Sequence, residues 1–178
     1  EEYCLLRFNQ GEKMTENVES IEQIEDDPIE VRRAKRAALI EAGIDPYGHA
    51  FERSDDIADL EERYAGLEDG QTTEDAVSLA GRVMARRVQG KIAFLELMDP
   101  TGTIQLFCRI NALGEDMFAA IKDLDVGDWI GVHGAMMRTR RGQLSVAVDD
   151  FELLSKSLRP LPEKFHGLTD KETRYRQR

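Results

Sequence analysis

Hydrophobic and polar positions alternate with a period of two between residues 79 and 110, which predicts strands that are buried on one face. The alternation falls into three runs, separated by the turn-forming sequences Gln89-Gly90 and Asp99-Pro100-Thr101-Gly102. One face of these runs is aliphatic and consists of Leu79, Gly81, Val83, Ala85, Leu95, Leu97, Ile104, Leu106, Cys108 and Ile110. We expect this face to form the core of an antiparallel sheet.

The opposite face combines aromatic, cationic and amide side chains. It carries Arg82, Arg86, Phe94, Gln105, Phe107 and Arg109. Aromatic rings among arginines and an amide are typical of a surface on which nucleic-acid bases stack. The alternative is a sheet that tolerates some apolar surface or that another element covers. The residue types leave both interpretations open.

A further helix and two further strands follow these three runs. Residues 111–124 have apolar positions at helical spacing, which predicts one helix. Strands are predicted over 129–138 and 143–154, the second with a kink at Asp149-Asp150. The turn Thr139-Arg140-Arg141-Gly142 joins the two strands into a hairpin.

Five strands with a helix between the third and the fourth have the order of an OB-fold. We therefore predict a mainly β protein, with a five-stranded Greek-key OB-fold barrel over residues 76–154. The exposed strand face and flanking loops of this fold bind oligonucleotides or oligosaccharides. The basic hairpin with Arg138, Arg140 and Arg141 is one of these loops. Because the fold hosts many functions, it does not identify the ligand by itself.

Two short helices are predicted ahead of the barrel, in a helical appendage over residues 27–75. Asp27 is a suitable N-cap for the first helix, and Gly43 a suitable left-handed C-terminal cap. Ser54 is the expected cap of the second helix, which Gly66 ends.

The first helix is basic because it contains Arg32, Arg33, Lys35 and Arg36, and we call the first three of these residues its basic cluster. Such a cluster is either a solvated face or a set of phosphate contacts, and the sequence does not decide between them.

The charge is distributed unevenly along the 178 residues, whose net charge is −11. Residues 1–75 carry 22 acidic and 8 basic side chains, a net charge of −14, whereas residues 76–178 carry 13 and 16, a net charge of +3. The strand region is therefore mildly basic, which favours a polyanionic partner there. No apolar run approaches a membrane span. With two cysteines, one on the predicted core face, we expect reduced thiols and a cytoplasmic protein.

Sequence motifs for catalysis are missing. The chain has no Walker loop, no glycine-rich dinucleotide motif and no Cys/His cluster with zinc spacing. His49, His133 and His166 lie far apart and are expected to be structural or on the surface. Nothing in the sequence supports catalysis by this chain alone.

Four blocks resemble the N-terminal part of class II lysyl-tRNA synthetases. They are R-R-A-K-R-A-A-L-I-E-A-G-I-D-P-Y, A-G-R-V-M-A-R-R, F-L-E-L-M-D-P-T-G-T-I-Q-L-F and S-K-S-L-R-P-L-P-E-K-F-H-G-L-T-D-K-E-T-R-Y-R-Q-R. The resemblance covers Pro28 to Arg178, and the last block is the most specific because it is similar to the family's hinge before its catalytic domain. Aspartyl- and asparaginyl-tRNA synthetases share the fold arrangement but lack that block.

The resemblance implies roles for residues of the predicted exposed face. Phe94 would stack on an anticodon base, the central uridine, while Gln105 would read a base edge and Arg82 would contact the base or a neighbouring phosphate. Gln143 stands where the family often has a glutamate that reads a base; its amide still accepts a hydrogen bond but lacks the charge. The helix with the basic cluster looks like a family segment near the tRNA backbone.

The resemblance also implies the wider organisation. Residues 155–178 would form a hinge toward a class II catalytic domain that is absent from this sequence. Residues 1–26 lie outside the resemblance; because they are polar and acidic without a sustained period, we expect a disordered leader or an artificial extension there. We expect no cofactor in this chain and lysine tRNA as its partner. For the full-length enzyme we expect ATP and Mg²⁺ as cofactors and a homodimeric state. Two rival hypotheses are a non-specific single-strand-binding module and a structural or dimerisation module in which Phe94 and Phe107 are buried against a partner.

Overall fold

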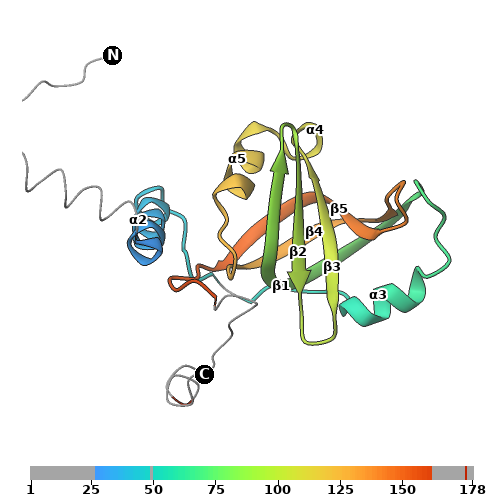
Figure 1. Cartoon of the computed structure of the whole chain (residues 1–178), viewed down its shortest axis with the longest axis horizontal. Helices are drawn as coiled ribbons and strands as arrows, with labels where there is room; N and C mark the ends of the chain where they lie inside the picture. The colour runs from blue at the N-terminus through green and yellow to red at the C-terminus, as the bar shows by residue number, and fades with distance from the viewer. Residues whose placement is uncertain (1–26, 49, 162–174, 176–178) are drawn as a thin grey trace, which may run out of the picture.

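Five strands form a closed barrel in the computed structural model, which describes residues 27–48, 50–161 and 175 (Figure 1). The strands are β1 (Thr72–Gln89), β2 (Ile92–Met98), β3 (Thr103–Arg109), β4 (Trp129–Arg138) and β5 (Leu144–Ser155). The helices are α2 (Pro28–Glu41), α3 (Ile57–Arg63), α4 (Ile110–Leu113) and α5 (Glu115–Asp123). The strand order is β1-β2-β3-β5-β4, and only the β3–β5 pair is parallel. The predicted five-stranded OB-fold barrel, with a helical segment after the third strand, is confirmed.

The predicted aliphatic face forms the core of the barrel. Its fully buried members include Leu79, Val83, Leu95, Leu97, Ile104, Leu106 and Cys108. The assignment was wrong at Ala85, which a register shift after Val83 moves out of the buried face. Ile110 packs against the core as predicted, but it opens α4 instead of continuing β3.

The single helix predicted over residues 111–124 is two helices, α4 and α5. Gly114 separates them at φ 81°, a left-handed backbone conformation that favours glycine because it has no Cβ. Phe118 and Ile121 of α5 are buried against the core. This pair of short helices covers the barrel near the end of β3 (Figure 1).

The N-terminal cap of α2 agrees with the prediction, whereas that of α3 does not. The Asp27 carboxylate accepts a hydrogen bond from the N–H of Ile29, at 2.9 Å. Ser54 does not cap α3; the first free N–H groups of this helix, on Ile57 and Ala58, instead donate to side chains of the β2–β3 turn. Because α3 lies against this turn and buries its own apolar side, it belongs to the barrel's packing (Figure 1).

The kink predicted at Asp149-Asp150 is present as a break in the β4–β5 register. His133 pairs with Asp150 while Gly134 pairs with Val148, which leaves Asp149 without a partner. A Cβ at Gly134 would lie 2.1 Å from the carbonyl oxygen of Ala147 in β5, so only glycine fits this close approach. Among the helices of the described residues, none has the length and apolar character needed to cross a membrane.

Candidate nucleic-acid interface

Two phenylalanines on the outer face of the barrel lie between two arginines. The strand register places Arg87 opposite Phe94, and Phe94 opposite Phe107. The two rings are 5.3 Å apart between centroids, the Arg87 guanidinium lies 5.4 Å from the Phe94 ring, and that of Arg109 lies 5.5 Å from the Phe107 ring. We call these four residues the aromatic row. Both rings are only half-buried, so they have apolar area to offer to a planar ligand.

A groove of about 470 Å³ runs beside the aromatic row. Phe94 lines it together with Glu96, Gln105 and Gln143, which supply carboxylate and amide groups at its surface. Glu96 and Gln105 are paired across β2 and β3, and each lies two residues along its strand from a phenylalanine of the aromatic row. Gln143 reaches the groove from the β4–β5 hairpin, far away in sequence. A flat apolar surface beside hydrogen-bonding groups suits an unpaired nucleobase.

Arg87 is a candidate site residue that the alternation pattern did not predict. Strict alternation along β1 assigns Arg86 to the outer face, but the irregularity between Val83 and Ala85 shifts the phase by one residue. Arg87 therefore stands beside Phe94, while Arg86 pairs with Leu95 and remains exposed at the groove. The alternating run that begins at Leu79 gave no signal of this shift. The length of β1, 18 residues, is known from the structure, and a strand of that length needs a bulge in order to coil around a small barrel.

Arg82 is not brought to the aromatic row. It lies opposite Met98 and Trp129, with its guanidinium 5.3 Å from the Trp129 ring. Phe94 lies four residues before Met98 on β2, so Arg82 is at the other end of this strand pair. The structure therefore favours Arg87 over Arg82 as the arginine next to the stacking ring.

Three of the four site residues predicted in the β4–β5 hairpin are exposed to solvent, whereas the fourth, Arg138, is hydrogen-bonded within the protein. Arg140, Arg141 and Gln143 are exposed. The Arg138 guanidinium instead donates hydrogen bonds to four backbone carbonyl groups, those of Tyr64, Ala65, Leu67 and Gly142. Its donors are committed within the protein, which favours a structural role for Arg138 over a phosphate contact.

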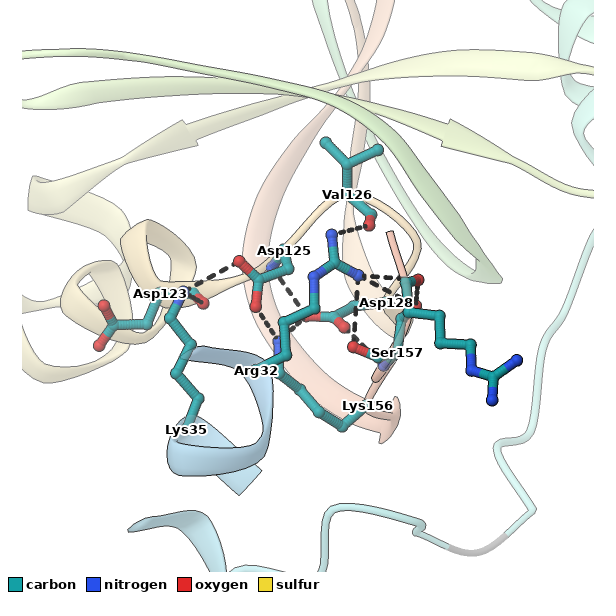
Figure 2. A network of polar contacts seen from close by, with 9 residues as sticks. Arg32, Lys35, Asp123, Asp125, Val126, Asp128, Lys156 and Ser157 are labelled. Carbon is teal, nitrogen blue, oxygen red and sulfur yellow. Dashed lines mark hydrogen bonds and ion pairs between the residues drawn. The ribbon is translucent and has the colours of Figure 1, made fainter. Parts of the chain in front are cut away.

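The basic cluster of α2 is mostly turned toward the barrel (Figure 2). Arg32 is buried, and its guanidinium donates to the carbonyl groups of Val126, Ser157 and Arg159 and to the hydroxyl group of Ser157. The Lys35 ammonium donates to the carbonyl of Asp123 and to the Asp125 carboxylate. Arg33 alone of the three is largely exposed, paired with Glu30. These contacts attach α2 to the loop before β4, so they favour a structural role for Arg32 and Lys35.

The same network contains a buried lysine. The Lys156 ammonium forms ion pairs with the carboxylates of Asp125 and Asp128 (Figure 2). Burial acts to raise the pKa of Asp125, but hydrogen bonds from Lys156 and Lys35 outweigh it and lower that pKa below its usual value. Lys156 follows β5 directly, so the network holds the point where the chain leaves the barrel.

Possible metal ligands are not clustered in the part of the chain that the structure describes. Among the described residues, no three His, Cys, Asp or Glu side chains are grouped so that they could hold a metal ion. His133, one of the three histidines in the sequence, is hydrogen-bonded to Ser78 and packs against Phe51.

The barrel and most of the rest of the chain are similar to known proteins. The tRNA anticodon family, described as an OB-fold nucleic acid binding domain, matches residues 77–154. The chain is 46% identical over 164 residues to a lysine–tRNA ligase of Streptococcus pneumoniae, covering 91% of this chain and 33% of that protein. It is 48% identical over 160 residues to a lysine–tRNA ligase of Streptococcus agalactiae, covering 89% of this chain and 32% of that protein. The chain thus spans about a third of the length of the curated relatives that it matches.

Proposed function

We propose that this chain recognises the anticodon loop of a lysine tRNA, because residues 77–154 match the OB-fold nucleic acid binding domain of the tRNA anticodon family and the chain is similar to lysine–tRNA ligases. The longer protein would attach lysine to that tRNA in an ATP-dependent reaction. The observation that carries this proposal is the aromatic row beside a groove lined by Gln105 and Gln143, on the outer face of such a domain.

Each group in the interface has a role that follows from its chemistry. Phe94 and Phe107 stack on unpaired bases, each stacked base contributing about 1–3 kcal/mol. Gln105 and Gln143 read base edges through their amide groups. Phosphate attraction comes from the exposed or half-exposed arginines Arg86, Arg87, Arg109, Arg140 and Arg141, and from Arg33 on α2.

The test is binding of a lysine-tRNA anticodon stem-loop to the chain, first with its central uridine and then with cytidine in that place. We expect the base change to weaken binding at least tenfold, at both low and moderate salt, because the groove reads the base edge. Equal, salt-sensitive binding of the two stem-loops would indicate a non-specific single-strand module. Absence of binding to either would favour the structural or dimerisation module.

A variant pair locates the binding surface. Phe94→Ala removes a stacking ring, so we expect about 5- to 150-fold weaker binding. Tyr47→Ala is the matched control, because Tyr47 is exposed and also carries an arginine 5.4 Å from its ring, yet lies outside the aromatic row. A large loss of melting temperature in Phe94→Ala alongside the lost binding would mark Phe94 as a core residue and contradict the assignment.

The wider setting rests on the resemblance to lysine–tRNA ligases. We propose that ATP and Mg²⁺ bind the part of the longer protein that holds the catalytic domain, that residues 155–178 form the hinge to it, and that the longer protein is a cytoplasmic homodimer. Residues 1–26 and most of this hinge lie outside the described residues.

A further inference from the structure

Helix α3 is hydrogen-bonded at each end to a different loop of the barrel. At its N-terminus, Ile57 donates to the Asp99 carboxylate at 3.0 Å and Ala58 donates to the Thr101 hydroxyl at 3.1 Å, both on the β2–β3 turn. Directly after its C-terminal end, the carbonyl groups of Tyr64, Ala65 and Leu67 accept hydrogen bonds from Arg138, the last residue of β4 before the hairpin turn. The helix thus connects two loops that the strand order does not join.

Arg138 is the centre of the second connection. Its Nε donates to the carbonyl of Leu67 at 2.6 Å, and its Nη2 to those of Tyr64 and Ala65 at 3.2 and 3.0 Å. Its Nη1 donates to the carbonyl of Gly142 in the hairpin turn, at 2.9 Å. One planar guanidinium therefore joins the loop after α3 to the hairpin, a geometry that suits the fixed fork of arginine.

The hairpin carries this connection to Gln143. The N–H of Gln143 donates to the Thr139 hydroxyl at 3.0 Å, and the N–H of Thr139 donates to the carbonyl of Gln143 at 2.9 Å. The backbone of Arg138 adds two bonds to the loop after α3, with the N–H of Gly70 donating to it and its own N–H donating to Gln71. Each of these bonds limits how far the exposed end of the hairpin moves relative to the groove.

We propose that Arg138 is a positioning residue for base recognition, because it holds the β4–β5 hairpin, and with it Gln143, in place at the edge of the groove. This inference rests on the proposed anticodon recognition. Base discrimination by a hydrogen bond needs the reading group held to within about 0.5 Å, which a free hairpin does not provide. Arg138 itself contacts no ligand in this proposal, since its side-chain nitrogens already donate to four carbonyl groups.

The deciding experiment is a double-mutant cycle between Arg138→Lys and Gln143→Ala, measured as binding of the uridine and cytidine stem-loops. Lysine keeps the charge but replaces the planar fork of three nitrogens by one ammonium nitrogen, which cannot reproduce the bonds of the guanidinium to all four carbonyl groups. We expect Arg138→Lys to weaken binding of the uridine stem-loop about 3- to 30-fold and to reduce the uridine preference. In the Arg138→Lys background, Gln143→Ala should then cost less than half of its fold-change in the wild type.

Controls separate positioning from other effects. Arg63→Lys makes the same exchange on α3 at a largely exposed arginine that pairs with Asp55, so its binding and uridine preference should equal those of the wild type. Hydrogen exchange of residues 139–143, measured without RNA, should be faster in Arg138→Lys than in the wild type. In the control Arg63→Lys it should equal that of the wild type. Should that variant fail to fold, Thr139→Val removes the hydroxyl that accepts from Gln143 and should lower the uridine preference in a folded chain.

Three results would overturn the proposal. One is a folded Arg138→Lys variant whose stem-loop binding and whose hydrogen exchange at residues 139–143 both equal those of the wild type. Another is a Gln143→Ala cost that is equal in both backgrounds, since Arg138 would then act independently of Gln143. The third is full uridine preference in Thr139→Val. If the wild-type chain binds neither stem-loop, the proposed function is overturned, and this inference with it. That conclusion would hold even if Arg138→Lys changes the hydrogen exchange of residues 139–143 as expected.

Discussion

The ion pairs of Lys156 with Asp125 and Asp128 should contribute strongly to stability, because their charges are buried. The Lys156 side chain is 2% exposed, that of Asp128 is 0% exposed and that of Asp125 is 16% exposed. In Lys156→Met, a side chain of similar length keeps the apolar contacts but removes the ammonium. The Asp128 carboxylate then keeps its hydrogen bonds from the N–H groups of Asp125 and Ser157 but loses the opposite charge.

The expected loss follows from this uncompensated charge. Breaking a buried pair by removing one partner typically costs about 3–5 kcal/mol, which is a large share of the usual free energy of unfolding of about 5–15 kcal/mol. With a urea m-value of about 2 kcal/mol/M, the midpoint of unfolding should fall by about 1.5–2.5 M. The assay is urea denaturation at pH 7, followed by circular dichroism, on the full chain.

Arg33→Met is the matched control for this prediction. Arg33 forms an ion pair with Glu30 at 2.5 Å, but the side chains are 61% and 40% exposed. Exposed pairs of this kind contribute about 0–1 kcal/mol, so the midpoint of urea unfolding should barely move. A loss in Lys156→Met of less than about 1 kcal/mol, or one no larger than that of Arg33→Met, would refute the view that burial makes this pair important.

The pH dependence of the same difference provides a second check. The pKa of Asp125 is lowered in the folded chain, because the hydrogen bonds from Lys156 and Lys35 outweigh the opposite effect of burial. A carboxyl group with a lowered folded pKa stabilises the protein above its unfolded pKa of about 3.9, and this stabilisation is lost as the pH falls through the folded pKa. The difference in the free energy of unfolding between the wild type and Lys156→Met should therefore be constant from about pH 5 to pH 8 and become smaller below about pH 4.

Three further predictions concern single positions in the barrel. Burial acts to raise the pKa of Asp99, but hydrogen bonds led by the N–H of Ile57 lower it, so Asp99→Asn should reduce the free energy of unfolding by about 2 kcal/mol near pH 7. That loss should shrink as the pH of the denaturation experiment falls below about 4. Gly134→Ala should destabilise the chain by at least about 2 kcal/mol in urea denaturation, because the added Cβ would lie 2.1 Å from a carbonyl oxygen of β5. Burial raises the pKa of Cys108 to about 12, so iodoacetamide should leave this thiol unmodified at pH 8 until urea unfolds the chain, as mass spectrometry of a Cys4→Ser variant would show.

The local sequence determined most of the barrel and part of the site. Period-two alternation depends only on the geometry of one strand, which is why it identified the buried face of β2 and β3 without knowledge of their neighbours. For the same reason it placed Phe94, Gln105 and Phe107 on one outer face. The N-cap of α2 was also predictable, since Asp27 and the N–H that it accepts from are two residues apart.

Tertiary structure decided which basic residues are free to meet a ligand. Arg32 and Arg138 look like surface cations in the sequence, but their guanidinium groups donate to backbone carbonyl groups that come from distant segments. The register shift in β1 brought Arg87 to Phe94, because the register between two strands depends on both of them. The cap of α3 comes from Asp99 and Thr101, 42 and 43 residues away from their partners. A local pattern determines which face of an element a side chain occupies, whereas its hydrogen-bond partners depend on which segments the folded chain brings beside it.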